Sequence, residues 1–263
     1  MGGSADLTGS NKTWIDSSSA FQKDTPDGRN IYFGVREHAM GGIVNGIAVH
    51  GGIIPYSGTF FIFSDYMRPA LRVSALSQYP CIWVFTHDSI GLGEDGPTHQ
   101  PIEHLASLRA MPEMVLIRPA DANEVVEAWR VAIQRRDGPT MIVLTRQNVP
   151  ILDRDIYEPA EGLAKGAYIL KDVKNPDIIL LASGSEVDII TKAAEQLHNQ
   201  GINARVVSFP SWKLFESQSQ EYRDHVLPPS VKHKVAVEAG TSLGWHKWIG
   251  PKGRTITIDH FGA

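Results

Sequence analysis

The sequence predicts an α/β protein of two doubly wound domains, each built on a mainly parallel sheet. Runs of β-branched residues alternate with segments of helical periodicity, which indicates parallel strands covered by helices on both faces. The alternation stops at residues 147–165 and then starts again. A chain of 263 residues, 42% of them hydrophobic, can fill the cores of about two domains.

The first domain is expected at residues 1–150 and opens with an ordered loop over 1–30, which is rich in Ser, Gly, Asp and Asn. The predicted helices are 36–50, 60–78, 102–111 and 123–135, and the predicted strands are 81–86, 114–117 and 140–144. Gly41, Gly42 and Gly46 each cost about 1 kcal/mol inside a helix, so we expect a close approach to another helix or to a ligand. Pro69 is expected to kink its helix or to mark a boundary.

A linker is predicted at 151–165, because the break around it contains two prolines, mixed charge and no periodicity. The second domain, 166–263, is expected to contain strands 178–182, 204–209, 234–238 and 255–259, and helices 186–200 and 218–226. The chain stops directly after the last strand, where a further helix would be expected. We therefore expect an incomplete second domain and a chain that is a fragment.

Composition excludes several classes of protein. With 25 basic and 29 acidic residues, the chain lacks the positive charge typical of a nucleic-acid partner. No apolar stretch reaches the roughly 20 residues that span a bilayer. The single cysteine, Cys81, cannot form an internal disulfide and favours a reducing compartment. Because the N-terminus also lacks a signal-peptide pattern, a cytoplasmic location is expected.

Two candidate features lie on the predicted helices 36–50 and 60–78. Glu37 follows a Tyr-Phe-Gly-Val-Arg run at a helix start. It is either an ordinary first-turn carboxylate that favours the helix dipole, or a partly buried carboxylate that shares a proton with a ligand nitrogen. Phe60, Phe63 and Tyr66 are spaced to share one helix face. They either pack in the core or form a stacking wall for a flat heteroaromatic ring.

The segment Thr-His-Asp-Ser-Ile-Gly-Leu-Gly-Glu-Asp-Gly-Pro-Thr-His-Gln-Pro follows strand 81–86, and open α/β sheets bind ligands at the carboxyl ends of strands. It contains two histidines, three acids and three glycines, which makes an ordinary solvated loop a poor explanation. A metal site is the alternative, but the short His-x3-His or Cys-x2-Cys spacing of a closed site is absent. No metal site is therefore predicted in this chain.

Two weaker candidates follow other strands. Arg146 comes after 140–144 and is either a surface ion-pair partner or a fork that grips a phosphate. Ser183, Gly184 and Ser185 precede a predicted helix and resemble an anion-binding helix start. Neither a P-loop nor a dinucleotide fingerprint is present in the sequence.

Taken together, the strings GGSADL, FGVREHAM, GTFFIFSDYMRPALR, THDSIGLGEDGPTHQP, RPAD and GPTMIVLTRQN resemble transketolases, in order and over essentially the whole chain. In that family, one domain binds the diphosphate of thiamine diphosphate through a metal ion. A second domain binds the aminopyrimidine ring, and a third is not directly catalytic. This chain is similar to the second domain and most of the third, and the Gly-Asp-Gly metal motif of the first is absent.

The resemblance implies a role for each candidate residue. Glu37 matches the glutamate that hydrogen-bonds the pyrimidine nitrogen N1′ and promotes the imino tautomer. Phe63 matches the aromatic residue that stacks on the pyrimidine, and Phe60 and Tyr66 complete that cage. The implied sugar-phosphate contacts are His87 and Arg146 with the phosphate, Asp95 and His99 with hydroxyls near the donor carbonyl, and Ser10 with the phosphate.

The family activity is transfer of a two-carbon ketol unit from a ketose phosphate to an aldose phosphate, as in the pentose phosphate pathway. The resemblance implies thiamine diphosphate and Mg²⁺ or Ca²⁺ as cofactors, with the metal ligands in the missing domain. It also implies a homodimer or a partner chain that carries the diphosphate domain. Alone, this chain is predicted to be inactive and to bind the cofactor weakly.

Other functions share this architecture. Dihydroxyacetone synthase, 1-deoxyxylulose-5-phosphate synthase and the β subunit of 2-oxo-acid dehydrogenases are related, but the two histidines and Arg146 favour a sugar-phosphate channel. A non-catalytic association module, or a naturally separate subunit of a related enzyme, is the alternative from a different class.

Overall fold

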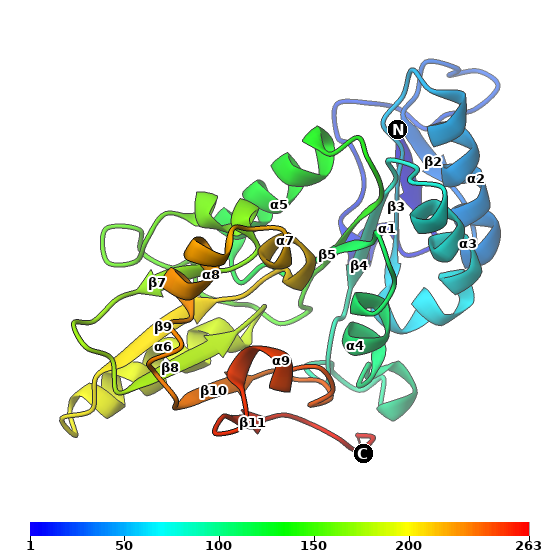
Figure 1. Ribbon diagram of the computed structural model, residues 1–263. Coiled ribbons are helices and arrows are strands. Elements are labelled where there is room, and N and C mark those ends of the chain that lie inside the picture. Colours follow the sequence, from blue (N-terminus) through cyan, green and yellow to red (C-terminus); the bar gives the residue numbers. More distant parts are fainter. Residues whose placement is uncertain (263) are drawn as a thin grey trace.

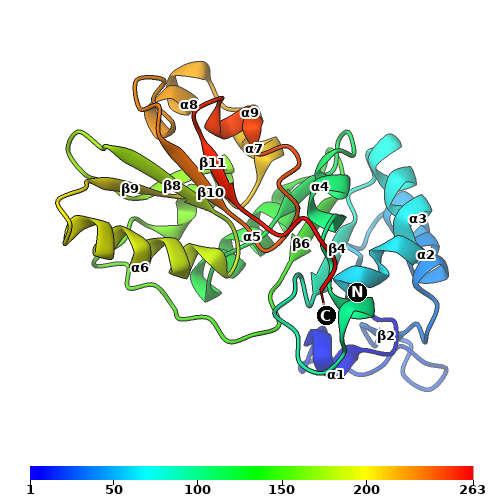
Figure 2. The same cartoon turned by 90° about the horizontal axis from the view of Figure 1, so that it is seen from below.

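A computed structural model describes residues 1–262 and contains two sheets (Figures 1 and 2). The first sheet has six parallel strands in the order β2-β1-β3-β4-β6-β5. Its strands are β1 (Gly2–Ser4), β2 (Asn30–Tyr32), β3 (Tyr56–Phe60), β4 (Ile82–Thr86), β5 (Val115–Ile117) and β6 (Thr140–Val143). The parallel α/β class predicted from the sequence is confirmed.

Helices cover both faces of this sheet. Successive side chains along a strand point to opposite faces and pack into two separate hydrophobic cores, each closed by helices. Trp83 and Phe85 of β4 pack with residues of α2, α3 and α4. Ile82 and Val84 pack with α5 on the opposite face. The helices are α1 (Thr8–Asn11), α2 (Glu37–His50), α3 (Ser64–Leu76), α4 (His104–Arg109) and α5 (Ala122–Gln134). This alternation is the two-residue period of a strand that is buried on both faces.

The second sheet has the order β11-β10-β8-β9-β7, and β7 is its one antiparallel strand among the described residues. Its strands are β7 (Tyr168–Lys171), β8 (Ile178–Ala182), β9 (Ala204–Ser208), β10 (Lys234–Val237) and β11 (Arg254–Ile256). α6 (Glu186–His198) packs on one face, as Figure 2 shows. The opposite face carries α7 (Trp212–Glu216), α8 (Gln220–Val226) and α9 (His246–Ile249).

Two expectations about the first 80 residues were wrong. Residues 1–30 contain β1 and α1 rather than only a loop, and β2 begins at their end. β1 is buried and rich in glycine: a Cβ on Gly3 would lie 1.8 Å from the Ile31 carbonyl oxygen, so the strand approaches its neighbour as only glycine allows. Residues 60–78 are not one helix. Phe60 ends β3, a 3-10 turn covers Phe61–Phe63, and α3 continues through Pro69.

The glycines of α2 divide into two groups. A Cβ on Gly41 would lie 2.7 Å from the Ala70 Cβ of α3, so the predicted close approach to another helix is confirmed there. Gly42 and Gly46 face open space on the outer side of α2. The segment predicted as a linker contains a 3-10 helix at Ala160–Lys165. Across the described residues, no helix is both long and apolar enough to cross a membrane.

Candidate active site

A row of aromatic rings lies at the carboxyl edge of the first sheet. The Phe60 ring at the end of β3 stacks on His87 with centroids 3.7 Å apart and on Phe63 at 6.0 Å. Phe63 stacks in turn on Tyr66 of α3 at 5.8 Å, and His99 meets the Phe63 ring edge-on at 5.5 Å. The row thus collects side chains from a strand end, a 3-10 turn, a helix and the loop after β4.

The row is not part of the core, so the core-packing alternative is wrong for these rings. Phe61, which was not singled out, is the fully buried ring of this segment. Phe60 and Phe63 are half-buried and Tyr66 is 64% exposed. Partly open, near-parallel rings can stack on a flat ligand ring, with offset faces as aromatic pairs prefer.

Glu37 is the first residue of α2 and is 8% exposed. Within residues 1–262, no hydrogen bond or ion pair engages its carboxylate, although α2 packs along α3, which carries Tyr66. Most of the Glu37 side chain is buried, but its carboxylate oxygens are not among the fully enclosed polar atoms that lack a partner, so they remain accessible. An unengaged carboxylate at this position can therefore bond a ligand nitrogen.

A chain of four hydrogen bonds fixes the proton on His87. Ser4 Oγ donates to the Gly58 carbonyl at 2.8 Å, so it must accept from Asn11 Nδ2 at 2.5 Å. Asn11 then presents Oδ1 to Thr86, whose hydroxyl donates to it at 2.6 Å. Since the Thr86 proton is used, Thr86 Oγ1 accepts from His87 Nδ1 at 2.9 Å. Neutral His87 therefore carries its proton on Nδ1, and Nε2 is the basic nitrogen.

The predicted polar residues of the channel gather around His87. Burial, and then the Arg146 guanidinium, lower the pKa of His87, while Asp95 and Asp88 oppose that shift. A Cβ on Gly93 would lie 3.9 Å from Arg146 Nη2, so the loop after β4 lies against the end of β6. Arg146 is exposed and borders a pocket of about 440 Å³.

Ser10 is exposed near the end of α1, next to Asn11, which bonds Thr86. No hydrogen bond or ring contact joins Ser10 or Glu37 to the aromatic row within residues 1–262. The structure thus brings Phe60, Phe63, Tyr66, His87, Asp95, His99 and Arg146 together and places Ser10 and Glu37 on flanking elements.

Residues 1–151 match the family model "Transketolase, pyrimidine binding domain", and residues 166–263 match "Transketolase-like TK C-terminal domain". The chain belongs to the transketolase family. It is 55% identical to the transketolase of Geobacillus stearothermophilus and 54% identical to that of Aquifex aeolicus over its whole length. It spans 40% and 38% of those two relatives.

Solved transketolase structures agree with this assignment. The enzyme from Leishmania mexicana superposes with a TM-score of 0.95 at 45% identity, covering 100% of this chain and 38% of that one. A Pichia stipitis transketolase in complex with sedoheptulose-7-phosphate gives 0.94 at 46%, with 100% and 39% covered. A protein described as "Split gene transketolase, inactive beta4 tetramer" gives 0.77 at 27%, with 99% and 83% covered.

Several residues of this candidate site were missed by sequence analysis. Asn11 and Thr86 orient His87, and Asp88 next to it forms a buried ion pair with Arg118. Arg118 directly follows β5, so the rule that selected Arg146, a cation at the carboxyl end of a strand, could have found it.

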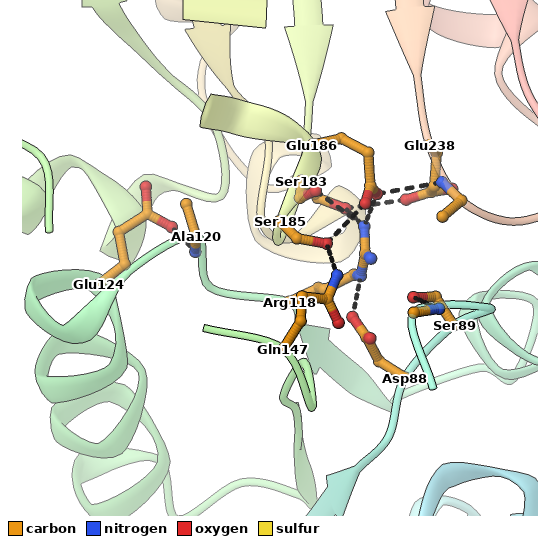
Figure 3. A network of polar contacts seen from close by, with 12 residues as sticks. Asp88, Ser89, Arg118, Ala120, Glu124, Gln147, Ser183, Ser185, Glu186 and Glu238 are labelled. Carbon is orange, nitrogen blue, oxygen red and sulfur yellow. Dashed lines mark hydrogen bonds and ion pairs between the residues drawn. The ribbon is translucent and has the colours of Figure 1, made fainter. Parts of the chain in front are cut away.

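Residues 183–185, which resemble an anion-binding helix start in sequence, are occupied by groups of the chain itself. The Ser183 carbonyl accepts from Arg118 Nη1 at 2.8 Å, and Ser185 Oγ donates to Glu186 Oε1 at 2.6 Å (Figure 3). A Cβ on Gly184, whose φ is +60°, would lie 2.5 Å from the Arg118 guanidinium. This helix start is therefore filled by a cation and a carboxylate of the chain itself.

Asp65, Glu103 and His104 lie close enough to be considered as metal ligands. His104 Nε2 is 3.1 Å from Asp65 Oδ2, and Nδ1 is 3.8 Å from Glu103 Oε2. The two carboxylates approach different nitrogens of one ring, and of these two contacts only the one from Asp65 to Nε2 is a hydrogen bond.

Proposed function

We propose that this chain supplies the pyrimidine-binding and C-terminal parts of a thiamine-diphosphate-dependent transketolase. The pyrimidine-binding domain is proposed at 1–150, a linker at 151–165 and the C-terminal domain at 166–263. The complete enzyme would move a two-carbon ketol unit from a ketose phosphate to an aldose phosphate. The observation that carries the proposal is the partly open aromatic row together with Glu37, which is mostly buried and whose carboxylate has no partner among residues 1–262.

Each residue has a part in this chemistry. The bound cofactor supplies the electron sink, and the protein orients it and controls protons. Phe63, with Phe60 and Tyr66, holds the flat ring by stacking. Glu37 holds a proton at the ring nitrogen it faces.

The substrate phosphate is proposed to bind Arg146 and His87, with Ser10 beside them. Nδ1 of His87 is committed to Thr86, so the ring can donate to a phosphate only when Nε2 is also protonated. Burial and the Arg146 guanidinium lower the pKa of His87 and outweigh Asp95 and Asp88, so the protonated form would depend on the negative charge of the bound phosphate itself. Asp95 and His99 are proposed to orient the hydroxyls of the sugar.

The cofactor diphosphate and its Mg²⁺ or Ca²⁺ are proposed to bind a different domain, carried by a second copy or by a partner chain. The outer face of α2 suits such a contact, since Gly42 and Gly46 are open and Ile43 and Val49 are exposed between and beside them. A protein of similar extent carries the description "inactive beta4 tetramer", which supports our proposal that this chain alone is inactive.

A cytoplasmic location is also proposed, because the single cysteine is used as a core residue. Cys81 is buried, and burial raises the pKa of its thiol to about 12. Such a thiol is unreactive and has no disulfide partner in the chain.

The proposal is tested by calorimetric titration of thiamine diphosphate with Mg²⁺. We expect weak binding to this chain alone and tight binding once a diphosphate-binding domain is added. In that assembly, Phe63→Ala should weaken binding by about 5-fold to 150-fold, since stacking on one aromatic ring contributes about 1–3 kcal/mol. Phe21→Ala, at an exposed phenylalanine outside the row, is the control. Sub-micromolar binding by the isolated chain would contradict the proposal.

A further inference from the structure

The start of α6 in the second domain holds Arg118, and through it the loop that carries His87. Arg118 is fully buried at the end of β5. Its Nε donates to Asp88 Oδ2 at 2.7 Å, and its Nη1 donates to the Ser183 carbonyl at 2.8 Å and to Glu186 (Figure 3). One side chain therefore joins the loop after β4 to the other domain.

A second link runs from the same helix start to the segment that carries Arg146. Gln147 Nε2 donates to Ser185 Oγ at 3.1 Å, and Ser185 Oγ donates to Glu186 Oε1. The Gln147 side chain also lies against Gly91 of the loop after β4, where a Cβ would meet it at 2.4 Å. Both links end on Glu186, whose Oε2 also accepts from the Ala239 backbone at 3.0 Å.

The two anchored residues are the sequence neighbours of the two proposed phosphate ligands. Asp88 follows His87, and Gln147 follows Arg146. His87 has a φ of +59°, a left-handed conformation that a residue with a side chain keeps only when its surroundings hold it. The buried Asp88–Arg118 pair directly after it provides that hold.

We infer that the second domain sets the spacing between His87 and Arg146, and that Arg118 and Gln147 are positioning residues for the substrate phosphate. This inference rests on the proposed function. Neither residue needs to touch the substrate. Breaking one partner of a buried ion pair is costly because it leaves an uncompensated buried charge, so the pairs of Arg118 with Asp88 and Glu186 resist displacement of the loop.

The test compares three variants in the assembled enzyme, which contains this chain and a diphosphate-binding domain. Arg118→Lys weakens the link from α6 to the loop that carries His87, and Gln147→Met weakens the link from α6 to the segment that carries Arg146. Arg109→Lys is the matched control, because Arg109 is also buried between the domains. It donates to both Glu238 oxygens at 2.6 and 2.7 Å, yet it neighbours neither phosphate ligand. The measurements are kcat and KM for a phosphorylated ketose, the same constants for an unphosphorylated ketose, inhibition by inorganic phosphate, and the melting temperature.

We expect Arg118→Lys and Gln147→Met to raise KM for the phosphorylated ketose, and the inhibition constant of inorganic phosphate, by about 10-fold, since displacements of about 1 Å at a binding site have effects up to about 100-fold. The constants for the unphosphorylated ketose should stay unchanged. Arg109→Lys should lower the melting temperature without changing phosphate affinity.

Unchanged phosphate affinity in both loosened variants, or an equal loss in Arg109→Lys, would overturn the inference. If Arg118→Lys does not fold, Gln147→Met alone decides between these outcomes. His87→Asn and Arg146→Met separate this result from the proposed function. If these two variants weaken phosphate binding while the loosened variants do not, only the inference fails. If His87→Asn and Arg146→Met also leave phosphate binding unchanged, the proposed phosphate site itself is wrong.

Discussion

The carboxyl edges of the two sheets hold similar residues but use them differently. In the first sheet, the residues after β4 and β6 include His87 and Arg146, which lie beside a partly exposed loop and a partly exposed aromatic row. In the second sheet, the residues after β8 and β10 bond Arg118 and Arg109 of the first domain. One edge is open to a ligand, and the other binds arginines of its own chain.

Charge pairing explains why the second edge can be buried. Burial alone would raise the pKa of Glu238, but Arg109 and Arg118 outweigh it and hold that pKa below its usual value. Ser183 and the Trp245 indole donate to the same carboxylate at 2.8 and 2.9 Å. The polar groups at this edge are thus paired within the chain. The carboxyl end of a strand therefore favours polar residues, but it does not decide whether they bind a ligand or one another.

The largest expected effect is a difference in stability between variants of two arginines, Arg118 and Arg146, which follow the neighbouring strands β5 and β6. Arg118→Met should lower the free energy of unfolding by about 3–5 kcal/mol, because it leaves Asp88 and Glu186 buried without their cation. Arg146→Met should change it by less than about 0.5 kcal/mol, because Arg146 is exposed. Urea unfolding of both variants measures the difference. Equal losses would show that the two edges are not distinct.

A smaller effect is expected in the hydrogen bonds that reach the open edge. Thr86→Val should cost about 1–3 kcal/mol, since it leaves Asn11 Oδ1 without a donor and His87 Nδ1 without an acceptor. The control is Thr59→Val on the adjacent strand, because the buried Thr59 hydroxyl has no partner among the described residues. Urea unfolding should show no loss for the control. A loss for Thr59→Val as large as that for Thr86→Val would show that the Thr86 effect does not come from its hydrogen bonds to Asn11 and His87.

The smallest effect is a pH dependence at His87. Its pKa in the folded chain lies below the usual value of 6.5, so the unfolded chain takes up this proton first as the pH falls. The contribution of His87 to stability is therefore complete above about pH 6.5 and decreases as the pH falls below it. His87→Asn should flatten that part of the curve of unfolding free energy against pH. A steeper decrease in the variant would reverse the assigned direction.

Long periodic segments were predictable from sequence, and contacts between distant segments were not. Strands β4, β6 and β8 and helices α2, α5 and α6 were found within two residues of their observed bounds, because they carry apolar periodicity or β-branched runs. Strands β3 and β7 were not predicted, and neither were the short strands β1 and β2, whose sequences Gly-Gly-Ser and Asn-Ile-Tyr are too short to show a strand period. β1 and β2 exist because β1 pairs with both β2 and β3.

The same limit applies to the candidate site. His87 and Arg146 were selected because they follow strands, and the structure places them together. Arg118 follows β5 in the same way, and only its burial against the second domain separates its role from that of Arg146. Asn11 was missed because its partner, Thr86, is 75 residues away.

Two buried glutamates in the first turns of their helices provide the most direct test. Glu37 is unengaged within the described residues, whereas Glu124 of α5 accepts from Ser208, Tyr168 and the Ala120 backbone. The measurement is the rate of ketol transfer in the assembled enzyme after Glu37→Gln and after Glu124→Gln. We expect Glu37→Gln to lower the rate by about 100-fold or more while the protein stays folded, because a positioned acid–base group contributes at least that much. Glu124→Gln should lower the melting temperature and leave the rate unchanged. Transfer by Glu37→Gln at the unaltered rate would contradict the account.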